Sequence, residues 1–574
     1  MKNFQIAQIF SKYADILEIK EDNPFKIRAY RKAAQSLESL TEDIDKLARD
    51  NRLQEIPGIG KDLAEKIKEF LNKGKISSFE ELCKSIPEGV FRMLEIPGVG
   101  PKTAKMLYEK IGVKSIEELE KLAREHKLSG LPGLKDKTEE NILKGIKLLK
   151  KGRERMLLGT ALPLAELIIS ELKNLKEVKR ITYAGSLRRM KETVRDIDIL
   201  VTSTHSEKVM EYFVKLKQVK EVLAKGTTKS SILTYEGIQV DLRVVEPESF
   251  SSCLLYFTGS KQHNIHLRTL AQKMGLKVSE YGVFEEKTNK NLAKNKEEEE
   301  IYKILGLSYI PPELREDLGE IEAAQSRKLP QLLELEDIKG DLHLHSDWSD
   351  GMHSLEELAK EGIRRGYEYI AITDHSQSLG IARGLDEERL LRQIEEIKKI
   401  NQKLRNFRLL CGTEVDIRKD GSLDLDKKVL EKLDVVVAAL HTGFKQSKEE
   451  LTKRVIKAFE TGLVNILAHP SGRLLGEREA YELDYQTIFK VAKEKGVCLE
   501  INSYPQRLDL TDVNARAAKN NGIILAIGTD SHSLSQWDYM RLGVAVARRA
   551  WLEKKDVLNS LPLKELFKKL KSLR

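Results

Sequence analysis

Residues 183–201 read YAGSLRRMKETVRDIDILV and join a glycine-serine pair, two arginines and two aspartates to an apolar run. The Ile, Leu and Val residues around Asp196 and Asp198 predict a β-strand. Side chains at positions i and i+2 lie on the same face of a strand, so these two carboxylates are expected to be close neighbours. Two buried carboxylates repel each other unless a cation lies between them. The stretch therefore predicts a strand that carries a divalent metal site.

The residues before this strand suit a phosphate group. Gly185 and Ser186 predict a turn at the start of a helix, where free backbone N–H groups attract an anion. Arg188 and Arg189 follow, and their planar guanidinium groups match phosphate oxygens. Because Mg²⁺ is commonly bound by one or two carboxylates together with substrate phosphates, a combined metal and phosphate site is expected here.

A third carboxylate is expected from Asp241, which lies in the β-branched run IQVDLRVV at 238–245. Three carboxylates can hold two ions that stabilise both the attacking and the leaving oxygen of a phosphoryl displacement. An Asp-x-Asp pair alone is also found among solvated or salt-bridged strand residues. The prediction therefore depends on the complete set of aspartates, glycine-serine turn and arginines.

The string G-S-x-R-R…D-I-D-I-L…V-D-L-R resembles the catalytic core of the family X DNA polymerases, within the nucleotidyltransferase superfamily. The similarity continues through YFTGSKQHNIHLR at 256–268, where that family begins its thumb. The resemblance implies that Asp196, Asp198 and Asp241 ligate Mg²⁺ or Mn²⁺, and that Asp241 also activates the primer 3′-hydroxyl. The residues it assigns to the incoming nucleotide or the template are Gly185, Ser186, Arg189, Tyr256, Gly259, Asn264 and Arg268.

Length and composition set limits on the class of protein. A chain of 574 residues is expected to form roughly three to five domains. The 99 basic and 90 acidic residues give a net charge of +9, which permits nucleic-acid binding without arguing for it. The four cysteines form no Cys-x-x-Cys pair, so neither a zinc finger nor a disulfide framework is indicated. Without a long apolar run or a signal-peptide core, a cytoplasmic protein with no membrane partner is expected.

A hairpin is repeated in the N-terminal part of the chain. The segment IPGIGK at 56–61 recurs as IPGVGPK at 96–102, each time before a helical pattern. Glycine permits positive φ and close approach of a phosphate, and the following helix directs N–H groups at it. The pattern resembles the helix-hairpin-helix motif, which binds the DNA backbone without reading sequence. The predicted DNA-binding residues are Gly58, Gly60, Gly98, Gly100 and Lys102.

One such hairpin alone could be an ordinary turn between helices. A third copy, LPGLK at 131–135, has a lysine in place of the second glycine and is expected to be structural only.

Residues 1–80 also resemble the small lyase domain of the family X polymerases. Lys66 lies at the position of the Schiff-base lysine, which implies a 5′-deoxyribose-phosphate lyase. Asp62 and Phe25, however, replace a basic residue and a histidine of the family pattern. A nucleophilic lysine needs a desolvated or cation-flanked amine. The alternative for Lys66 is a solvated lysine that contacts DNA.

From residue 340 onward, apolar strand patterns alternate with helical ones. Seven strand candidates lie near 341–345, 368–373, 408–413, 434–440, 463–468, 497–501 and 523–528, and each precedes a helical stretch. This alternation predicts a parallel α/β barrel. Potential metal ligands lie at the carboxyl ends of six of these strands, where barrel folds place their chemistry. They are His343, His345, Asp350, His375, Glu414, His441, His469, Asp530 and His532.

Mixed imidazole and carboxylate ligands favour Zn²⁺, Mn²⁺ or Fe²⁺ over Mg²⁺, and a set of this size suits about two or three ions. The order of the ligands resembles that of the PHP (polymerase and histidinol phosphatase) domain, a distorted seven-stranded barrel, and none is missing. His375 is counted among the catalytic residues of this site. Arg383, Arg473 and Arg507 follow in nearby loops and are candidates for holding substrate phosphates, with ordinary surface arginine as the alternative.

Nearly the whole chain resembles the bacterial PolX group of family X polymerases, in the same order. The expected domains are a lyase-like helical domain at 1–80, fingers at 81–150, an α+β nucleotidyltransferase palm at 151–250, a thumb at 251–318, a linker at 319–336 and the PHP barrel at 337–574.

This order implies a gap-filling DNA polymerase that acts as a monomer on gapped or primer–template DNA and uses deoxynucleoside triphosphates. It also implies a 3′→5′ exonuclease in the PHP barrel, with cleavage at abasic sites as a further expectation. The alternative is a module that binds DNA ends and is tethered to a PHP phosphatase.

Overall fold

The structure is a computed structural model in which the chain divides into two compact units, Met1–Glu154 and Arg155–Arg574. The described residues are 2–38, 40, 44–84, 86–87, 89–90, 93–96, 99–128, 139, 142–143, 145–146 and 155–572. Among them, no helix combines the length and apolar character that a bilayer crossing requires.

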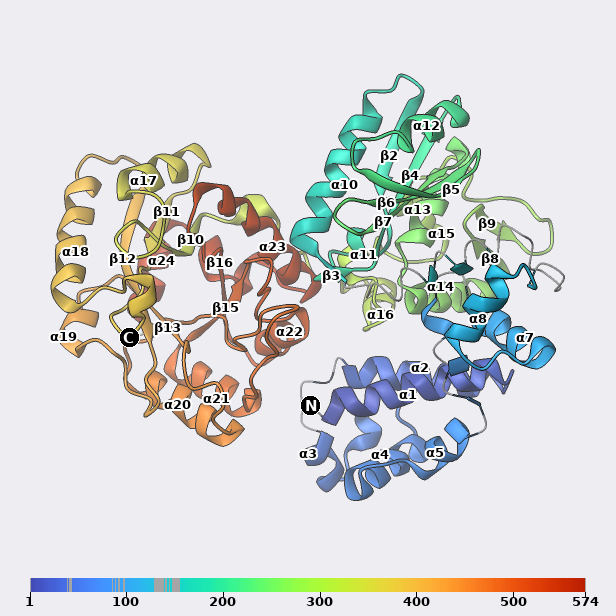
Figure 1. The fold of residues 1–574 in the computed structure, drawn as a ribbon. Helices are drawn as coiled ribbons and strands as arrows, with labels where there is room; N and C mark the ends of the chain where they lie inside the picture. The colour runs from blue at the N-terminus through green and yellow to red at the C-terminus, as the bar shows by residue number, and fades with distance from the viewer. Residues whose placement is uncertain are drawn as a thin grey trace. The chain divides into compact units, whose positions relative to one another are not determined.

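The first unit is helical and repeats one short motif (Figure 1). Each described hairpin begins with a single 3₁₀ turn, and a helix with a glycine at its N-cap follows. Buried aliphatic residues form two cores in this unit, one around each hairpin. Its helices are α1 (Lys2–Ile19), α2 (Pro24–Glu38), α3 (Ile44–Arg49), η1 (Leu53–Glu55), α4 (Lys61–Lys73), α5 (Ser77–Lys84), η2 (Met93–Glu95), α7 (Pro101–Ile111) and α8 (Ile116–Arg124).

A five-stranded sheet forms the part of the second unit that was predicted to be the palm. The strand order is β2-β4-β7-β6-β5, and β4 and β7 are parallel neighbours. The strands are β2 (Val178–Tyr183), β4 (Asp196–Ser203), β5 (Val219–Lys225), β6 (Lys229–Thr234) and β7 (Gln239–Val244). The other elements of this part are β1 (Met156–Leu157), α10 (Leu158–Lys173), α11 (Gly185–Arg188), β3 (Thr193–Val194) and α12 (Ser206–Phe213).

The predicted thumb has a small core of its own around a buried polar network. His263 contacts Glu320 through Nδ1 at 2.6 Å and the Tyr302 hydroxyl through Nε2 at 2.9 Å. A cis peptide bond joins Gly259 to Ser260, between the first two helices. The elements are η3 (Pro247–Ser249), α13 (Phe250–Thr258), α14 (Lys261–Lys273), β8 (Leu276–Ser279), β9 (Gly282–Glu285), α15 (Glu298–Ile304), η4 (Pro312–Leu314) and α16 (Glu320–Gln325).

The C-terminal part is a seven-stranded parallel sheet in sequential order, which confirms the predicted barrel. The Asp530 N–H donates to His343 O at 3.0 Å, and a bridge pairs Leu344 with Ser531, so the last strand nearly closes onto the first. The strands are β10 (Gly340–Leu344), β11 (Tyr369–Ile372), β12 (Arg408–Asp416), β13 (Val435–Ala439), β14 (Ile466–Leu467), β15 (Cys498–Asn502) and β16 (Leu525–Gly528).

Helices connect successive strands of the barrel, as Figure 1 shows in yellow to red. Capping boxes at Ser354 and Ser447 define where two of them begin, because each serine accepts a backbone N–H of the first turn. The helices are α17 (Leu355–Arg364), α18 (Glu387–Asn401), α19 (Lys427–Leu430), α20 (Lys448–Glu460), α21 (Tyr485–Lys495), α22 (Asp512–Asn520), α23 (Met540–Arg549) and α24 (Leu563–Ser572).

One apolar core runs through both the palm and the barrel. Buried residues of α10 and of the palm sheet belong to the same cluster as those of the barrel strands and α23. At Gly159 a Cβ atom would lie 2.5 Å from the side chain of Pro505 in a barrel loop. Leu333 and Ile338, between thumb and barrel, are buried in the same cluster. The two predicted catalytic regions are therefore built on one continuous packed body.

Candidate active sites

The three palm aspartates lie on the two adjacent parallel strands β4 and β7. The register places Asp198 directly opposite Asp241, while Asp196 lies opposite Gln239. Burial, followed by the negative charges of Asp196 and Asp241, raises the pKa of Asp198 to about 7. Such crowding disfavours the ionised form unless a cation is present. The arrangement suits the carboxylate side of a divalent metal site.

Gly185 brings the predicted phosphate turn against this group. Its φ of 63° lies in the left-handed region, and a Cβ there would approach Asp198 Oδ2 to 2.7 Å. Any larger residue would therefore be strained in its backbone and would also collide with the carboxylate. The turn at the start of α11 is thus packed against the metal-binding strand.

Two polar residues that the sequence analysis did not assign surround Asp241. Lys229 Nζ lies 3.0 Å from Asp241 Oδ2, and Gln239 Nε2 donates to Asp241 Oδ1 at 2.7 Å. Gln239 is two residues from Asp241 on β7, whereas Lys229 comes from β6 and is brought to Asp241 by the register of β6 and β7. A lysine on an adjacent strand could not be identified without that register.

The predicted phosphate-binding arginine is in contact with the thumb. Arg189 Nε donates to Glu316 Oε1 at 3.0 Å, and Arg189 Nη1 donates to Thr258 O at 2.5 Å. Arg188 donates to the Thr258 hydroxyl at 2.7 Å and pairs with the buried carboxylate of Glu298. Both arginines of the pair therefore connect the palm to the thumb.

The structure brings the thumb residues predicted to bind nucleotide into one group. Asn264 Nδ2 donates to Tyr256 O at 2.7 Å, and Arg268 Nε donates to Asn264 O at 3.2 Å. Arg189 Nη1 would lie 3.1 Å from a Cβ placed on Gly259. The roles of these residues toward a nucleotide stay predictions, but their proximity fits a shared binding surface.

The barrel ligands form three overlapping groups of potential metal-binding residues. Within each group the ligand atoms all lie within 4.8 Å of one another, and His345 and His375 each belong to two groups. The groups are His345, Asp350, His375 and His532; His343, His345 and Asp530; and His375, Glu414 and His441. Shared ligands of this kind suit adjacent ions.

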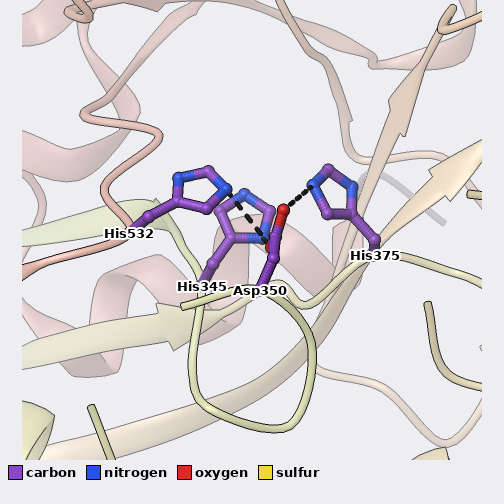
Figure 2. Close-up of side chains that lie close together, drawn as sticks. All are labelled: His345, Asp350, His375 and His532. Atoms are coloured by element: carbon purple, nitrogen blue, oxygen red, sulfur yellow. Dashed lines mark ion pairs between the residues drawn. The ribbon is translucent and has the colours of Figure 1, made fainter. Parts of the chain in front are cut away.

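Figure 2 shows the first group, with the Asp350 carboxylate directed toward the surrounding imidazoles. Asp350 Oδ1 lies 3.3 Å from His532 Nε2, and Asp350 Oδ2 lies 3.7 Å from His375 Nε2. The ninth residue, His469, joins the cluster through Glu414, whose Oε1 lies 2.9 Å from His469 Nε2. All nine predicted ligands thus come together at one rim of the barrel.

Several buried atoms of the cluster have no hydrogen-bond partner. His375 Nδ1 and Glu414 Oε2 lie 2.8 Å apart, yet neither forms an aligned hydrogen bond. Because buried polar atoms are normally satisfied, such atoms need another partner, and a divalent cation fits this donor set. The buried atoms without a hydrogen bond in the cluster are His343 Nε2, His345 Nδ1, His375 Nδ1, Glu414 Oε2, His441 Nδ1 and His469 Nδ1.

The electrostatics of His345 and Glu414 fit metal binding, whereas at His343, His441 and His532 burial is outweighed by neighbouring carboxylates, which raise the pKa of these imidazoles. Burial, followed by the neighbouring His375 and His532, lowers the pKa of His345 to about 3, so its imidazole is neutral and offers a lone pair. Burial would raise the pKa of Glu414, but the nearby imidazoles of His441 and His375 hold it well below its usual value. Neutral imidazoles and charged carboxylates are the ligand forms that such ions require.

Two ligands are held in an uncommon backbone conformation. His469 and Asp530 have φ values of 28° and 54°, which non-glycine residues rarely adopt. Observed strain of this kind is concentrated at functional sites, where the surrounding structure maintains it.

Glu500 is the main functional residue that the sequence analysis did not identify. It lies on β15, the one barrel strand to which no ligand was assigned, and it is buried. Its Oε1 lies 2.7 Å from His343 Nδ1, and its Oε2 accepts the His469 N–H at 2.7 Å. A carboxylate on the second nitrogen of a ligating histidine sets the tautomer and the ring orientation. The observation that could have revealed it is a charged residue inside the apolar run CLEIN.

Solvent exposure within the cluster is greatest at Asp350 and His532. The side chains of Asp350 and His532 are 32% and 31% exposed, whereas His343 and Glu414 are each 1% exposed. Arg507 Nε lies 3.3 Å from Asp530 Oδ2, and Arg383 is exposed, so both stay candidates for phosphate contacts. A substrate is expected to enter beside Asp350 and His532.

The two described hairpins present uncapped helix ends. Gly60 before α4 and Gly100 before α7 have nearly equal φ values, −84° and −90°, and neither helix has a side-chain cap. Such N–H groups can donate hydrogen bonds to the oxygens of a phosphate. Gly58 has a φ of 82° and would collide with Lys32 if it carried a Cβ. Gly98, the third hairpin at 131–135 and the Lys102 side chain lie outside the described residues.

The predicted lyase lysine has an acidic partner. Lys66 Nζ donates to Asp62 Oδ1 at 2.6 Å, one turn away on α4. A Schiff base requires a free amine, whereas this pair holds the lysine as a hydrogen-bond donor. The departure from the family pattern at Asp62 therefore has a direct structural consequence.

Comparison with known families identifies four segments. A helix-hairpin-helix domain matches residues 1–76, and a SAM-like helix-hairpin-helix tandem matches residues 91–148. The DNA polymerase beta thumb matches residues 253–316, and the PHP domain matches residues 341–504.

Curated relatives match either nearly the whole chain or a smaller part of it. A DNA polymerase/3′-5′ exonuclease PolX from Bacillus subtilis (strain 168) is 41% identical over 568 residues, which cover 99% of each chain. A probable phosphatase from Thermoanaerobacter sp. (strain X514) is 29% identical over 38% of this chain and 89% of its own length. Another probable phosphatase, from Acetivibrio thermocellus, is 33% identical over 33% of this chain and 78% of its own.

Proposed function

Because the chain belongs to the PolX family of DNA polymerases, we propose that it fills short gaps in DNA with its palm and removes 3′-terminal nucleotides with its PHP barrel. The observation that carries this proposal is the presence of two separate metal-suited clusters, three carboxylates on β4 and β7 and nine ligands on the barrel rim. The probable phosphatases match only a minor part of the chain, so a tethered phosphatase is the less favoured alternative.

In the palm, we assign the deoxynucleoside triphosphate to the surface between α11 and the thumb. Asp196 and Asp198 would hold Mg²⁺ or Mn²⁺, which stabilises the attacking and leaving oxygens when bound. Asp241 would accept the proton of the primer 3′-hydroxyl, and Ser186 and Arg189 would bind the triphosphate. Tyr256, Asn264 and Arg268 would contact the sugar, the base and the template.

In the barrel, the nine ligands would hold two or three Zn²⁺, Mn²⁺ or Fe²⁺ ions, which activate water for attack on a phosphodiester when bound. Glu500 orients His343, and Asp350 and His532 line the open side where the 3′ end would enter. Cleavage at abasic sites would use the same open side and is measured on a duplex that contains one abasic residue.

The hairpins at 56–60 and 96–100 are proposed to bind the DNA backbone. Their uncapped helix N-termini provide N–H groups for phosphates, and binding through the DNA backbone would suit an enzyme that acts at any gap. Binding should therefore weaken with salt and be insensitive to sequence.

A lyase activity at Lys66 would require Asp62 to release the amine. Borohydride trapping of a 5′-deoxyribose-phosphate adduct measures it directly. An adduct that persists in Lys66→Ala would contradict the assignment, whereas a lysine that only contacts DNA would give no adduct in the wild type.

The test of the main proposal separates the two sites. Asp198→Ala is expected to abolish extension of a primer in gapped DNA while degradation of a single-stranded oligonucleotide from its 3′ end continues. His375→Ala is expected to do the reverse. Joint loss of both activities in each variant would contradict two independent sites, and turnover of histidinol phosphate in preference to DNA would favour the phosphatase alternative.

A further inference from the structure

The palm segment from Arg189 to Arg195 joins the phosphate-binding turn to the metal-binding strand. It follows α11, contains β3 and leads directly into Asp196. Two arginines of the barrel contact it. Arg549 Nη1 donates to Arg189 O at 2.8 Å, and Arg473 Nη2 donates to Glu192 Oε2 at 2.7 Å. The loop between the two halves of the polymerase site is thus held by the other catalytic domain.

Arg549 is itself firmly held at the end of α23. Its side chain is 5% exposed, and Asp512 at the start of α22 accepts from its Nε at 2.8 Å. Its Nη1 also donates to Glu316 Oε1 at 3.0 Å, the same oxygen that accepts from Arg189 Nε. Glu316 is therefore shared by a barrel arginine and by the arginine assigned to the triphosphate.

Arg549 and Arg189 both stabilise the negative charge of the mostly buried Glu316 carboxylate. Burial opposes its ionisation, but Arg549, followed by Lys191 and Arg189, lowers the pKa of Glu316 to about 2. Without Arg549, the charged carboxylate would rely more heavily on Arg189. It would then compete more strongly with a triphosphate for the same guanidinium group.

Arg473 connects the palm segment to the loop after β15. Its Nε donates to Arg507 O at 2.8 Å and its Nη2 to Leu508 O at 2.6 Å. These contacts and the one with Glu192 engage the guanidinium group, so we assign Arg473 to holding the palm segment, while its role in phosphate binding stays a prediction. Its bonds fix the palm segment to a rigid part of the barrel.

We propose that Arg549 and Arg473 are positioning residues for nucleotide addition, through which the barrel holds segment 189–195 and keeps Arg189 available to the triphosphate. The inference rests on the proposed polymerase function and on the assignment of Arg189. Loss of either barrel arginine should weaken nucleotide binding, because the segment loses an anchor and, for Arg549, because Glu316 engages Arg189 more fully.

A matched control lies on the same helix. Arg541 of α23 also pairs with the palm, through Nη1 at 2.9 Å from Glu166 Oε1, but it contacts α10 rather than segment 189–195. Arg541→Gln therefore shows the effect of losing an ion pair between palm and barrel as such, at a side chain that is 36% exposed against 5% for Arg549. A positioning role predicts an effect on nucleotide binding only for Arg549 and Arg473, which contact segment 189–195.

The experiment compares Arg549→Gln, Arg549→Lys and Arg541→Gln in the full chain. We expect Arg549→Gln to raise the KM for a deoxynucleoside triphosphate in gap filling about tenfold, equal to about 1.4 kcal/mol, with a smaller change in kcat. Arg549→Lys should recover part of the affinity, and Arg541→Gln should leave KM unchanged. Exonuclease activity on a single strand should be retained in all three.

Variants of Arg473, Glu192 and Arg189 test the proposal beyond Arg549 itself. If Arg549→Gln does not fold, Arg473→Gln and Glu192→Gln act on the same segment, and unchanged KM in both would overturn the proposal. Arg189→Gln tests the underlying assignment separately: unchanged KM there would refute the role of Arg189. If Arg549 acts through Arg189, the double variant should lose less than the sum of the single losses, whereas additive losses would overturn the relay.

Discussion

The palm and the barrel hold their predicted metal ligands in two different ways. The palm presents three half-buried carboxylates from two neighbouring strands, and a lysine lies beside one of them. The barrel presents six histidines and three carboxylates from six strand ends, most of them buried. Carboxylates alone suit hard ions that arrive with a phosphate substrate, whereas the imidazole-rich set suits ions that stay bound. The comparison therefore predicts that the palm binds its metal ions together with the nucleotide substrate, whereas the barrel holds its metal ions before the substrate arrives.

The largest effect that would test this comparison is expected from His345→Ala. His345 belongs to two of the three ligand groups, so its loss should remove bound metal and lower exonuclease activity on the order of a thousandfold, while gap filling continues. Elemental analysis after gel filtration measures the bound metal. Asp198→Asn is the matched palm variant, and its metal content should equal that of the wild type. A loss of tightly bound metal in Asp198→Asn would break the comparison.

A smaller effect is expected when Glu500, which orients the ligand His343, is changed in place of a ligand itself. Glu500→Gln keeps the shape of the side chain but removes the charge beside His343 Nδ1. We expect a loss of metal affinity of about 10- to 100-fold, with corresponding loss of exonuclease activity at limiting metal. Excess Mn²⁺ should restore most of the activity. Activity that stays absent at saturating metal would indicate a misfolded barrel instead.

The metal ligands of the barrel could be predicted from the sequence, but the contacts that support them could not. The nine barrel ligands could be assigned because each follows an apolar strand pattern, and carboxyl ends of parallel strands meet at one rim. The partners of Glu500 could not be assigned, because nothing in its own strand shows which histidines it faces. Likewise, Asp196 and Asp198 share a strand face by spacing alone, whereas Lys229 reaches Asp241 only through the register of β6 and β7.

Contacts between segments far apart in the chain also could not be predicted from sequence patterns. The glycine-serine turn and Arg189 were identified, but Glu316 and Arg549 lie 127 and 360 residues away along the chain. Individual charged residues at such separations carry no periodicity, so only the folded chain shows that they meet.

On the palm side, Gly185→Ala should have a moderate effect. The added methyl group would be strained at a φ of 63° and would collide with Asp198 Oδ2, so we expect gap filling to fall about tenfold or more. The exonuclease should be unaffected. Gly237→Ala is a suitable control, since it also has positive φ, 89°, but no atom within 4 Å of the added Cβ. Equal losses in both variants would show that backbone strain, rather than contact with Asp198, is responsible.

The smallest effect is expected from Lys229→Met. This lysine is 44% exposed and competes with a metal ion for Asp241, so its removal should lower the Mg²⁺ concentration needed for half-maximal gap filling by about two- to threefold. Titration of extension rate with Mg²⁺ measures the change. Lys225→Met, on the neighbouring strand and paired loosely with Glu211 at 3.9 Å, should leave the titration unchanged. A higher Mg²⁺ requirement in Lys229→Met would instead assign the lysine to substrate binding.

The apolar core shared by palm and barrel affects how truncation experiments are interpreted. A shortened chain that ends before the barrel would leave the faces of α10 and the Leu333 region uncovered, and exposed apolar surface of that kind promotes aggregation. Poor gap filling by such a fragment would then reflect insolubility and would not reveal whether the missing half takes part in synthesis. Point substitutions in the intact protein are the appropriate way to dissect the two activities.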